Sequence, residues 1–248
     1  MILKINKNQF LNMNESIYIL IPSRIGSTRI KNKPLIDING ETLIQRVFKN
    51  ALNISPNTYV ATDSDKIKDN ILKISSNVIM TSDHISGTDR IYEAASKLNL
   101  PDDTFILNLQ GDEPFIPKEL IYQVINDFND NDCDVITVST KIKTNDEISD
   151  PNCVLVETDK SMYAKNFARV GNFTNPMRHI GIYGYSYKIL SNLVNLNPTK
   201  SELEFKLEQL RFLENNYSIY VSYYDGNIPN GIDTEQDVIA ANKYLQNK

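Results

Sequence analysis

The sequence contains no tryptophan and has very few cysteines or histidines. Its 248 residues include two cysteines, Cys133 and Cys153, and two histidines, His84 and His179. The cysteines have no CxxC spacing and no histidine close to them, so neither a structural disulfide nor a zinc site is expected. The chain also has no Ser-His-Asp or Cys-His arrangement whose spacing indicates nucleophilic catalysis. Any chemistry must therefore depend on other residue types.

Long hydrophobic segments are absent as well. The longest apolar run is residues 17–22, far shorter than the roughly 20 residues that a membrane-spanning helix needs. Residues 1–16 have no continuous apolar centre followed by a small-residue cleavage site, so they do not resemble a signal peptide. Free thiols are typical of a reducing compartment. These features predict a cytoplasmic protein without a membrane partner.

The charge balance is acidic. There are 26 Lys and Arg against 31 Asp and Glu, which gives a net charge of −5. Nucleic-acid binding needs a dense basic surface, so no nucleic-acid partner is expected. Hydrophobic residues make up 41% and charged residues 23%, as in ordinary globular proteins.

Apolar runs typical of strands alternate with segments that have helical periodicity. The predicted strands are 17–21, 59–62, 78–80 and 104–109, and the predicted helices are 41–52, 65–76, 88–98 and 117–129. This alternation indicates βαβ units and a mainly parallel central sheet. Strands dominate after residue 134, at 134–140, 154–158, 179–186 and 218–224, with helices at 201–215 and 234–246. We predict an α/β protein with an N-terminal extension (1–16) and a single domain (17–248), in which the later part forms a substrate-covering layer.

The two later helices each begin with a predicted capping box, Ser201 with Glu204 and Thr234 with Asp237. In such a box a side chain at the first position and an acidic side chain three residues later satisfy each other's backbone N–H groups.

The segment after the first strand, 22–34, is strongly basic. Arg24, Arg29, Lys31 and Lys33 are its four cations, and it contains no acid. Ligands of parallel sheets bind beyond the carboxyl ends of the strands, which is where this loop begins. Arginine and lysine bind phosphate oxygens, so the loop favours a polyphosphate ligand. The loop has neither the P-loop pattern nor the GxGxxG pattern of dinucleotide-binding proteins.

Acidic residues follow another predicted strand, in Leu109-Gln-Gly-Asp-Glu-Pro114. Mg²⁺ usually binds proteins through one or two carboxylates together with substrate phosphates, so Asp112 is a candidate metal ligand. Asp233, just before the last predicted helix, is a candidate second ligand from a distant part of the chain, although acids near helix starts are also favoured as caps.

The same segments resemble a known family. The motifs IPSRIGSTRIKNKPL, YVATDSDKI, MTSDHISGTDR, LNLQGDEPFIP, RHIGIYGY, LEQLR and GIDTEQD occur in this order and are similar to those of the 3-deoxy-manno-octulosonate (Kdo) cytidylyltransferases, from Ile17 to about Tyr244. The resemblance implies a Rossmann-like nucleotide-diphospho-sugar transferase fold with a smaller sugar-binding and dimerisation layer. It also implies transfer of CMP from CTP to Kdo with release of pyrophosphate, Mg²⁺ as cofactor, a homodimer, and a role in lipopolysaccharide synthesis.

The resemblance also implies roles for individual residues. Those for nucleotide binding are Arg24, Ser27, Arg29, Lys33, Ser86, Gly87, Thr88, Arg90 and Gln110. Those for the metal are Asp112 and Asp233, which together with Lys33 form the implied catalytic set. Those for the sugar acid are Arg169, Arg178, His179, Tyr183, Glu208 and Gln209.

One segment departs from the family pattern. The family usually has ALYFSR followed by a proline-containing turn, whereas residues 164–169 here are AKNFAR, with no proline up to 173. Because this segment borders the sugar site in the family, 8-amino-Kdo or a sialic-type nonulosonic acid is an alternative substrate. A glycosyltransferase that uses a nucleotide sugar and a non-catalytic nucleotide sensor are alternatives from other functional classes.

Overall fold

The computed structural model describes residues 17–26, 29–84, 86–144, 146–150, 152–169, 171 and 173–247. The predicted extension, 1–16, lies outside the described residues. Contacts between residues group the chain into two compact units, residues 1–118 with 228–248 and residues 119–227. The single domain over 17–248 stays a prediction.

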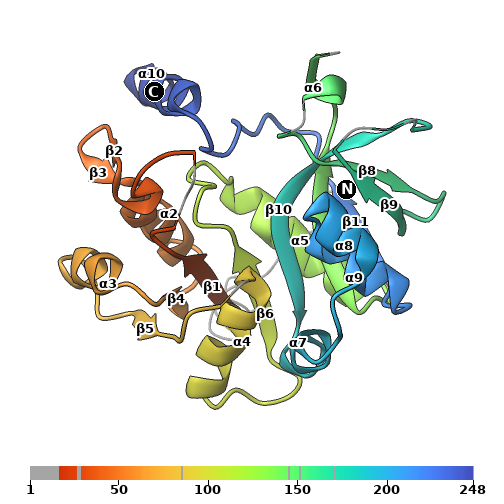
Figure 1. Ribbon diagram of the computed structural model, residues 1–248, viewed down its shortest axis with the longest axis horizontal. Helices are drawn as coiled ribbons and strands as arrows, with labels where there is room; N and C mark the ends of the chain where they lie inside the picture. The colour runs from red at the N-terminus through yellow and green to blue at the C-terminus, as the bar shows by residue number, and fades with distance from the viewer. Residues whose placement is uncertain are drawn as a thin grey trace, which may run out of the picture. The chain divides into compact units, whose positions relative to one another are not determined.

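The first unit is built on a parallel sheet (Figure 1). Its strands are β1 (Ile17–Ser23), β4 (Thr58–Thr62), β5 (Val78–Met80) and β6 (Phe105–Leu109), in the order β6-β1-β4-β5. Ile19, Leu20 and Ile21 of β1 are all fully buried, as is typical of a strand that is covered on both faces. The predicted parallel sheet and its four strands are confirmed.

Helices α2 (Leu43–Leu52), α3 (Asp65–Leu72), α4 (Gly87–Lys97) and α10 (Glu235–Gln246) belong to this unit. The 3-10 helix η1 (Lys33–Leu35) and the short strands β2 (Asp37–Ile38) and β3 (Glu41–Thr42) complete it. A capping box formed by Thr42 and Gln45 begins α2. The predicted helix 41–52 is confirmed, and the apolar residues of one of its faces are all buried, namely Leu43, Ile44, Val47, Phe48 and Ala51.

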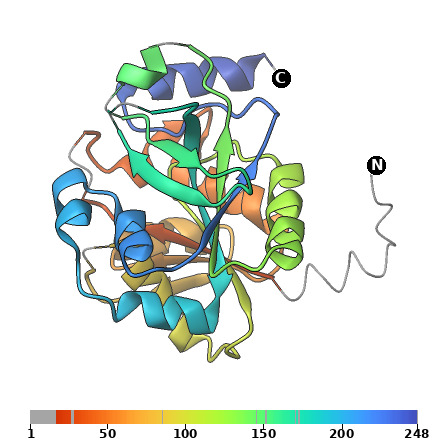
Figure 2. The same cartoon turned by 90° about the vertical axis from the view of Figure 1, so that its right-hand side faces the viewer.

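The second unit contains a mixed sheet in which β7 (Val135–Thr140) lies between β10 (Met177–Ser186), antiparallel to it, and β11 (Ile219–Tyr223), parallel to it. Strands β8 (Leu155–Thr158) and β9 (Ala164–Ala168) form an antiparallel pair, drawn in green-cyan in Figure 2. The helices are α5 (Lys118–Asp130), α6 (Asp146–Ser149), α7 (Tyr187–Val194), α8 (Lys200–Phe205) and α9 (Glu208–Glu214).

The predicted helix 201–215 is wrong, because the structure divides it into α8 and α9. Lys206 adopts the left-handed conformation at φ 55° and ends α8. The capping box of α8 is formed by Thr199 and Glu202, and not by the predicted pair two residues later. A left-handed residue of ordinary type has no sequence signal comparable to glycine, so helical periodicity alone did not show the break. The capping box of Thr234 and Asp237 at α10 is confirmed.

Candidate active site

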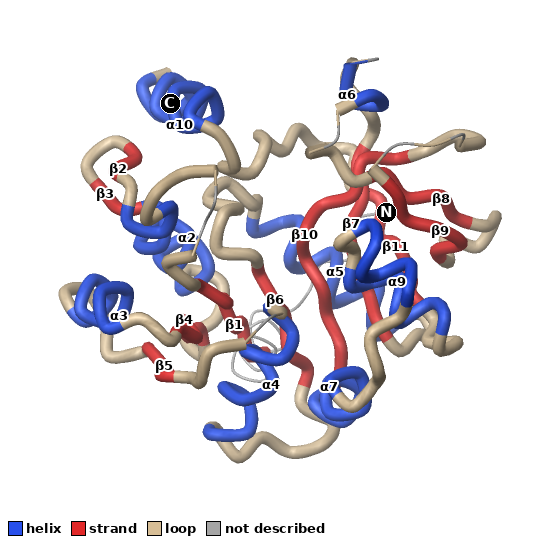
Figure 3. Tube along the Cα trace, viewed as in Figure 1, coloured by secondary structure: helices blue, strands red, loops and turns tan. Residues whose placement is uncertain are grey.

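A cavity of about 370 Å³ lies in the first unit where the loops after β1 and β6 meet. Figure 3 shows these loops in tan beyond the red strands. Its lining includes eight of the residues predicted to bind nucleotide or metal: Arg24, Arg29, Lys33, Ser86, Gly87, Arg90, Gln110 and Asp112. Ser27 lies outside the described residues, and Thr88 is 3% exposed within α4 and does not line the cavity. Segments up to 90 residues apart in sequence therefore converge on one polar cavity.

Lys33 is the centre of an ionic cluster. Its Nζ atom lies 2.6 Å from Oδ2 of Asp112 and 2.8 Å from Oδ1 of Asp233. Burial acts to lower the pKa of Lys33, but the charges and hydrogen bonds of the two aspartates outweigh it, so the pKa is raised above its usual value. Lys33 is consequently a permanent cation that draws two carboxylates, from distant parts of the chain, to one point.

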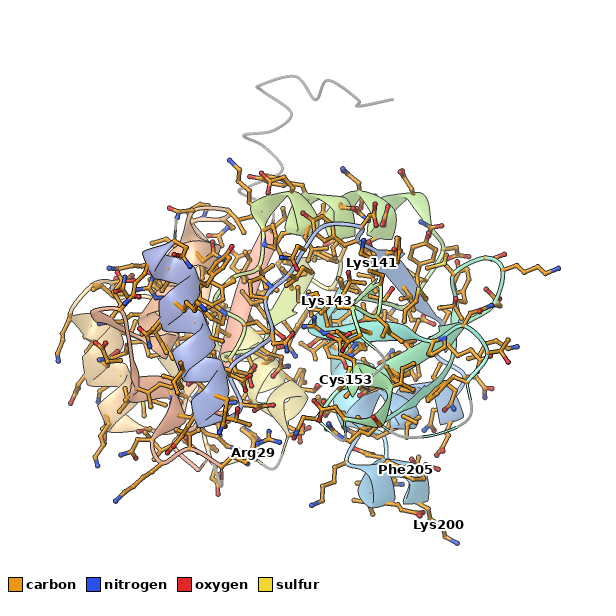
Figure 4. All side chains as sticks on the ribbon, turned by 90° about the horizontal axis from the view of Figure 1, so that it is seen from above. Arg29, Lys141, Lys143, Cys153, Lys200 and Phe205 are labelled. Atoms are coloured by element: carbon orange, nitrogen blue, oxygen red, sulfur yellow. The ribbon has the colours of Figure 1, made fainter. Side chains whose placement is uncertain are left out.

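Asp233 reaches this cluster from the loop before α10. Besides Lys33 it binds Nη2 of Arg29 at 2.7 Å, and Figure 4 shows Arg29 near one end of α10. Burial acts to raise the pKa of Asp233, yet Lys33 and Arg29 hold it below the usual value. The backbone N–H of Ile232 donates to the carbonyl of Asp112 at 2.8 Å, which fixes the two acidic loops together. The structure thus places the two predicted metal ligands side by side.

Gly111 is required by the close approach of two loops. A Cβ atom at this position would lie 2.9 Å from the carbonyl oxygen of Pro22, a distance too short for a real side chain. The loop after β6 can therefore pack against the end of β1 only if glycine precedes Asp112.

Arg90 forms the buried side of the cavity. It is 2% exposed and donates to Oγ1 of Thr81 at 2.6 Å and to Oδ2 of Asp63 at 2.9 Å. Asp63 carries no distinctive signal in the sequence, although it is the first residue after β4 and lies in one of the strand-end loops where ligand-binding residues concentrate. Since a buried guanidinium needs a compensating charge, Asp63 keeps Arg90 in position.

His84 is a second lining residue that the sequence analysis did not assign. Its Nε2 atom lies 2.6 Å from Oε2 of Glu93, which also accepts the backbone N–H of Ser82. Burial acts to raise the pKa of Glu93, but hydrogen bonds from Lys97, His84 and the Ser82 backbone lower it to about 2. This carboxylate therefore stays ionised and holds the imidazole against the cavity wall.

Helix α4 begins at the cavity wall. Ser86 is its N-cap, and its Oγ atom accepts the backbone N–H of Asp89 at 3.0 Å. Gly87, the first helical residue, also lines the cavity. The partial positive charge of a helix N-terminus is consistent with an anionic ligand here.

The second unit brings together four of the six predicted sugar-binding residues. The rings of His179 and Tyr183 lie 5.5 Å apart, and His179 Nε2 lies 2.8 Å from Oγ1 of Thr137. Burial, followed by the positive charge of Arg169, lowers the pKa of His179 to about 3. Burial, followed by the negative charge of Glu208, raises the pKa of Tyr183. The imidazole and the phenol are thus both neutral, and the charges of Arg169 and Glu208 act on them.

The two remaining sugar candidates, Gln209 and Arg178, are both buried. Gln209 is 4% exposed in α9. Arg178 is 7% exposed and precedes His179 directly in β10. Consecutive residues of a strand point to opposite faces, so Arg178 and His179 lie on different sides of the sheet. The sugar-binding roles of both residues stay predictions.

Comparisons with known proteins give a consistent result. A family model described as "Cytidylyltransferase" matches residues 18–219. A 3-deoxy-manno-octulosonate cytidylyltransferase from Francisella tularensis subsp. novicida is 40% identical, covering 90% of this chain and 96% of that protein. The protein of the same name from Lawsonia intracellularis is also 40% identical, covering 89% and 91%. The chain belongs to the 3-deoxy-manno-octulosonate cytidylyltransferase family.

Solved structures agree with this family membership. The structure of CMP:2-keto-3-deoxy-manno-octonic acid synthetase complexed with CTP has a TM-score of 0.85 and 30% identity, covering 93% of this chain and 98% of that one. A 4-diphosphocytidyl-2C-methyl-D-erythritol synthase from Anaerococcus prevotii has a TM-score of 0.60 at 17% identity, which shows a shared fold. The predicted family and the nucleotidyltransferase fold are confirmed.

The lowered pKa of His179 predicts an acid-sensitive fold for this cytidylyltransferase. With a folded-state pKa of about 3 against an ordinary 6.5, the unfolded chain binds a proton that the folded chain excludes. Stability is therefore lost as the pH falls from 6.5 towards 3, by about 1.4 kcal/mol per pH unit at most. We expect His179→Gln to make this loss shallower, as measured by urea unfolding at pH 7, 6, 5 and 4. Parallel curves for the parent and the variant would contradict the shift.

Proposed function

We propose that this protein transfers CMP from CTP to the anomeric hydroxyl of Kdo and releases pyrophosphate. The observation that carries the proposal is the cluster of Lys33, Asp112 and Asp233 in a cavity that is also lined by Arg24 and Arg29. This arrangement suits a polyphosphate that reacts at a phosphorus atom. The assignment of cytosine as the base and of Kdo as the acceptor comes from the relatives and from the CTP-bound structural neighbour.

The basic residues of the cavity bind the triphosphate in this proposal. Arg24, Arg29 and Lys33 donate to its oxygens and stabilise the negative charge that develops on them during transfer. Arg90 and Gln110 line the cavity and donate hydrogen bonds to the base, which binds at the wall where α4 begins. The sugar's hydroxyl is the nucleophile, so the protein needs no covalent intermediate.

Asp112 and Asp233 would hold Mg²⁺. Their oxygens already meet at one cation, the Lys33 ammonium, and two carboxylates plus phosphate oxygens are a donor set that Mg²⁺ accepts. Among the described residues no group of three or more His, Cys, Asp or Glu side chains could hold a metal alone, which is consistent with a site completed by substrate. When bound, Mg²⁺ neutralises phosphate charge and lowers the pKa of the attacking hydroxyl.

Arg169, His179, Tyr183, Glu208 and Gln209 bind the sugar acid in this proposal. The departures from the family motif, Lys165 and Asn166, are exposed positions of β9, whereas Phe167 beside them is buried and packs on His179. The substitutions therefore leave the packing next to His179 in place. The relatives favour Kdo over 8-amino-Kdo or a sialic-type acid, and an enzyme over a nucleotide sensor.

The finer features of the family belong to the proposal as well. We propose a homodimer that acts in the cytoplasm and supplies lipopolysaccharide synthesis. Within the described residues, no helix is long and apolar enough to cross a membrane.

Pyrophosphate release tests the proposed reaction. The purified protein is incubated with CTP and Mg²⁺ together with Kdo, 8-amino-Kdo or a sialic acid, and release is measured for each. We expect release with Kdo at the highest kcat/KM. Preferential turnover of another acid would replace Kdo as the proposed acceptor. No release with any of the three acids would contradict the proposed catalytic activity.

The contact between Asp63 and Arg90 predicts a binding defect. Asp63→Asn removes the charge opposite the buried guanidinium, and losing a charged hydrogen-bond partner costs about 1.5–3 kcal/mol. We expect the KM for CTP to rise by at least about tenfold, with a smaller change in kcat, because Asp63 acts through Arg90 and does not contact the phosphates.

Asp65→Asn is the matched control for this prediction. Asp65 lies two residues further along the chain, in the first turn of α3, is 76% exposed and pairs with Lys68. Equal kinetics for the two variants would contradict the positioning role of Asp63.

A further inference from the structure

A buried hydroxyl group in the second unit contacts the imidazole of His179. Thr137 of β7 is fully buried, and its Oγ1 atom lies 2.8 Å from Nε2 of His179 in β10. The same oxygen donates to the backbone carbonyl of Ile182 at 2.7 Å. Thr137 is not one of the residues that the family resemblance implies for the sugar acid, so its role is inferred from this geometry alone.

The two contacts of the Thr137 hydroxyl fix the tautomer of His179. A hydroxyl group has one hydrogen, and a carbonyl oxygen can only accept, so the hydrogen of Thr137 is used on Ile182. Thr137 must therefore accept from His179, whose Nε2 atom carries the hydrogen. Burial lowers the pKa of His179 to about 3, so the ring is neutral at pH 7. A neutral imidazole has a single N–H, which leaves a lone pair on Nδ1.

An irregularity in β10 makes the second of these contacts possible. Ile180 pairs with Val138, but Tyr183 pairs with Thr137, the next residue of β7, so β10 carries extra residues at this point. The bulge includes Ile182, whose carbonyl oxygen accepts the Thr137 hydroxyl instead of a backbone N–H of β7. Bulges often lie next to active sites, where they redirect side chains.

The imidazole is held in one orientation with Nδ1 available to a ligand. Its ring lies 5.3 Å from the ring of Phe167, edge to face, and 5.5 Å from that of Tyr183. None of the residues that the structure describes is hydrogen-bonded to Nδ1, and the side chain of His179 is partly exposed. His179 therefore presents a hydrogen-bond acceptor in a fixed direction.

We propose that Thr137 is a positioning residue that holds His179 as the Nε2–H tautomer, so that Nδ1 accepts a hydrogen bond from a hydroxyl group of the sugar acid. An ionised carboxylate has no hydrogen to donate, so it is not the group that binds Nδ1. A sugar acid offers both groups, and the acceptor nitrogen selects the hydroxyl. This inference rests on the proposed transfer to a sugar acid.

Steady-state kinetics of three variants test the positioning role. Thr137→Val removes the hydroxyl with almost no change of shape, and Thr137→Ser keeps it. Ser139→Ala is the control, because it removes another buried hydroxyl from the same face of β7, one that donates to Sδ of Met177. We expect the KM for Kdo to rise about tenfold in Thr137→Val alone, with the KM for CTP unchanged in all three.

Nitrogen NMR of the full-length protein tests the tautomer without turnover. The ring nitrogen shifts separate protonated from unprotonated nitrogens, and the His179 signals are assigned by their absence in His179→Gln. We expect Nε2 to be protonated and Nδ1 unprotonated in the parent and in Thr137→Ser, and a mixture of tautomers in Thr137→Val. With CTP present and Mg²⁺ chelated, Kdo should shift the Nδ1 signal, whereas pyruvate, a keto acid without hydroxyl groups, should not.

Each outcome separates this inference from the proposed reaction. A hydrogen on Nδ1 in the parent, or an equal Nδ1 shift with pyruvate, would overturn the inference even if Kdo is turned over. An unchanged KM for Kdo in Thr137→Val, or an equal rise in Thr137→Ser, would also overturn it. Absence of turnover in the parent contradicts the proposed reaction, while the spectra still test the contact. If Thr137→Val does not fold, the spectra of the parent and of Thr137→Ser decide.

Discussion

Replacing Asp112 with asparagine is expected to reduce turnover by about 10²–10³-fold, the range found when one preorganised electrostatic contact is removed from an active site. Asp112 follows β6, lines the cavity and binds Lys33 at 2.6 Å. Asparagine has nearly the same shape, so the loop packing at Gly111 and the backbone bond from Ile232 remain. What disappears is a negative charge that would hold Mg²⁺.

The measurement is pyrophosphate release at increasing Mg²⁺, together with the unfolding temperature. We expect Asp112→Asn to need more Mg²⁺ for half-maximal rate and to unfold near the parent temperature. Asp102→Asn, an exposed acid in the loop before β6, is the control and should match the parent in both. A variant with near-normal turnover would refute the metal role of Asp112.

The elements that bear on the cavity could be predicted because their signals are local. The apolar run at residues 17–21 predicted a strand, and β1 is a strand that is buried on both faces. Parallel strands end at the same edge, so the basic loop after β1 and Asp112 after β6 had to be close. That the two loops lie close together follows from topology, whereas the ion pair between Lys33 and Asp112 is seen only in the structure.

Contacts between side chains from distant segments could not be predicted in the same way. Asp63 became identifiable only once Arg90 was seen to be buried against it, because an acid after a strand is common. His84 had no local signal beyond its loop, and its anchor Glu93 lies in the next helix. Arg178 is a different case. The alternation of side chains along a strand places Arg178 and His179 on opposite faces of β10. The family motif contains both residues, and on that basis both were assigned to the sugar acid.

Replacing Lys33 with methionine is expected to reduce kcat/KM for CTP by about 10²–10³-fold, comparable to Asp112→Asn. Methionine keeps much of the length of the aliphatic stem but loses the ammonium that both aspartates contact and that binds the triphosphate in the proposed reaction. Only 15% of the side chain is exposed, and its raised pKa ensures that a full charge is lost at neutral pH. Lys31→Met is the control, since Lys31 is an exposed cation of the same loop with no ion pair among the described residues.

The response to Mg²⁺ distinguishes the two variants, because in the proposed site the metal would use the carboxylate oxygens that the Lys33 ammonium contacts. In Lys33→Met the two aspartates lose their internal cation and repel each other, which favours a divalent cation between them. We therefore expect the Mg²⁺ concentration for half-maximal rate to fall or stay constant in Lys33→Met, whereas it rises in Asp112→Asn. If both variants needed more Mg²⁺, Lys33 would be organising the metal ligands and not competing for them, and its contribution to catalysis would have to be assigned to positioning of Asp112 and Asp233.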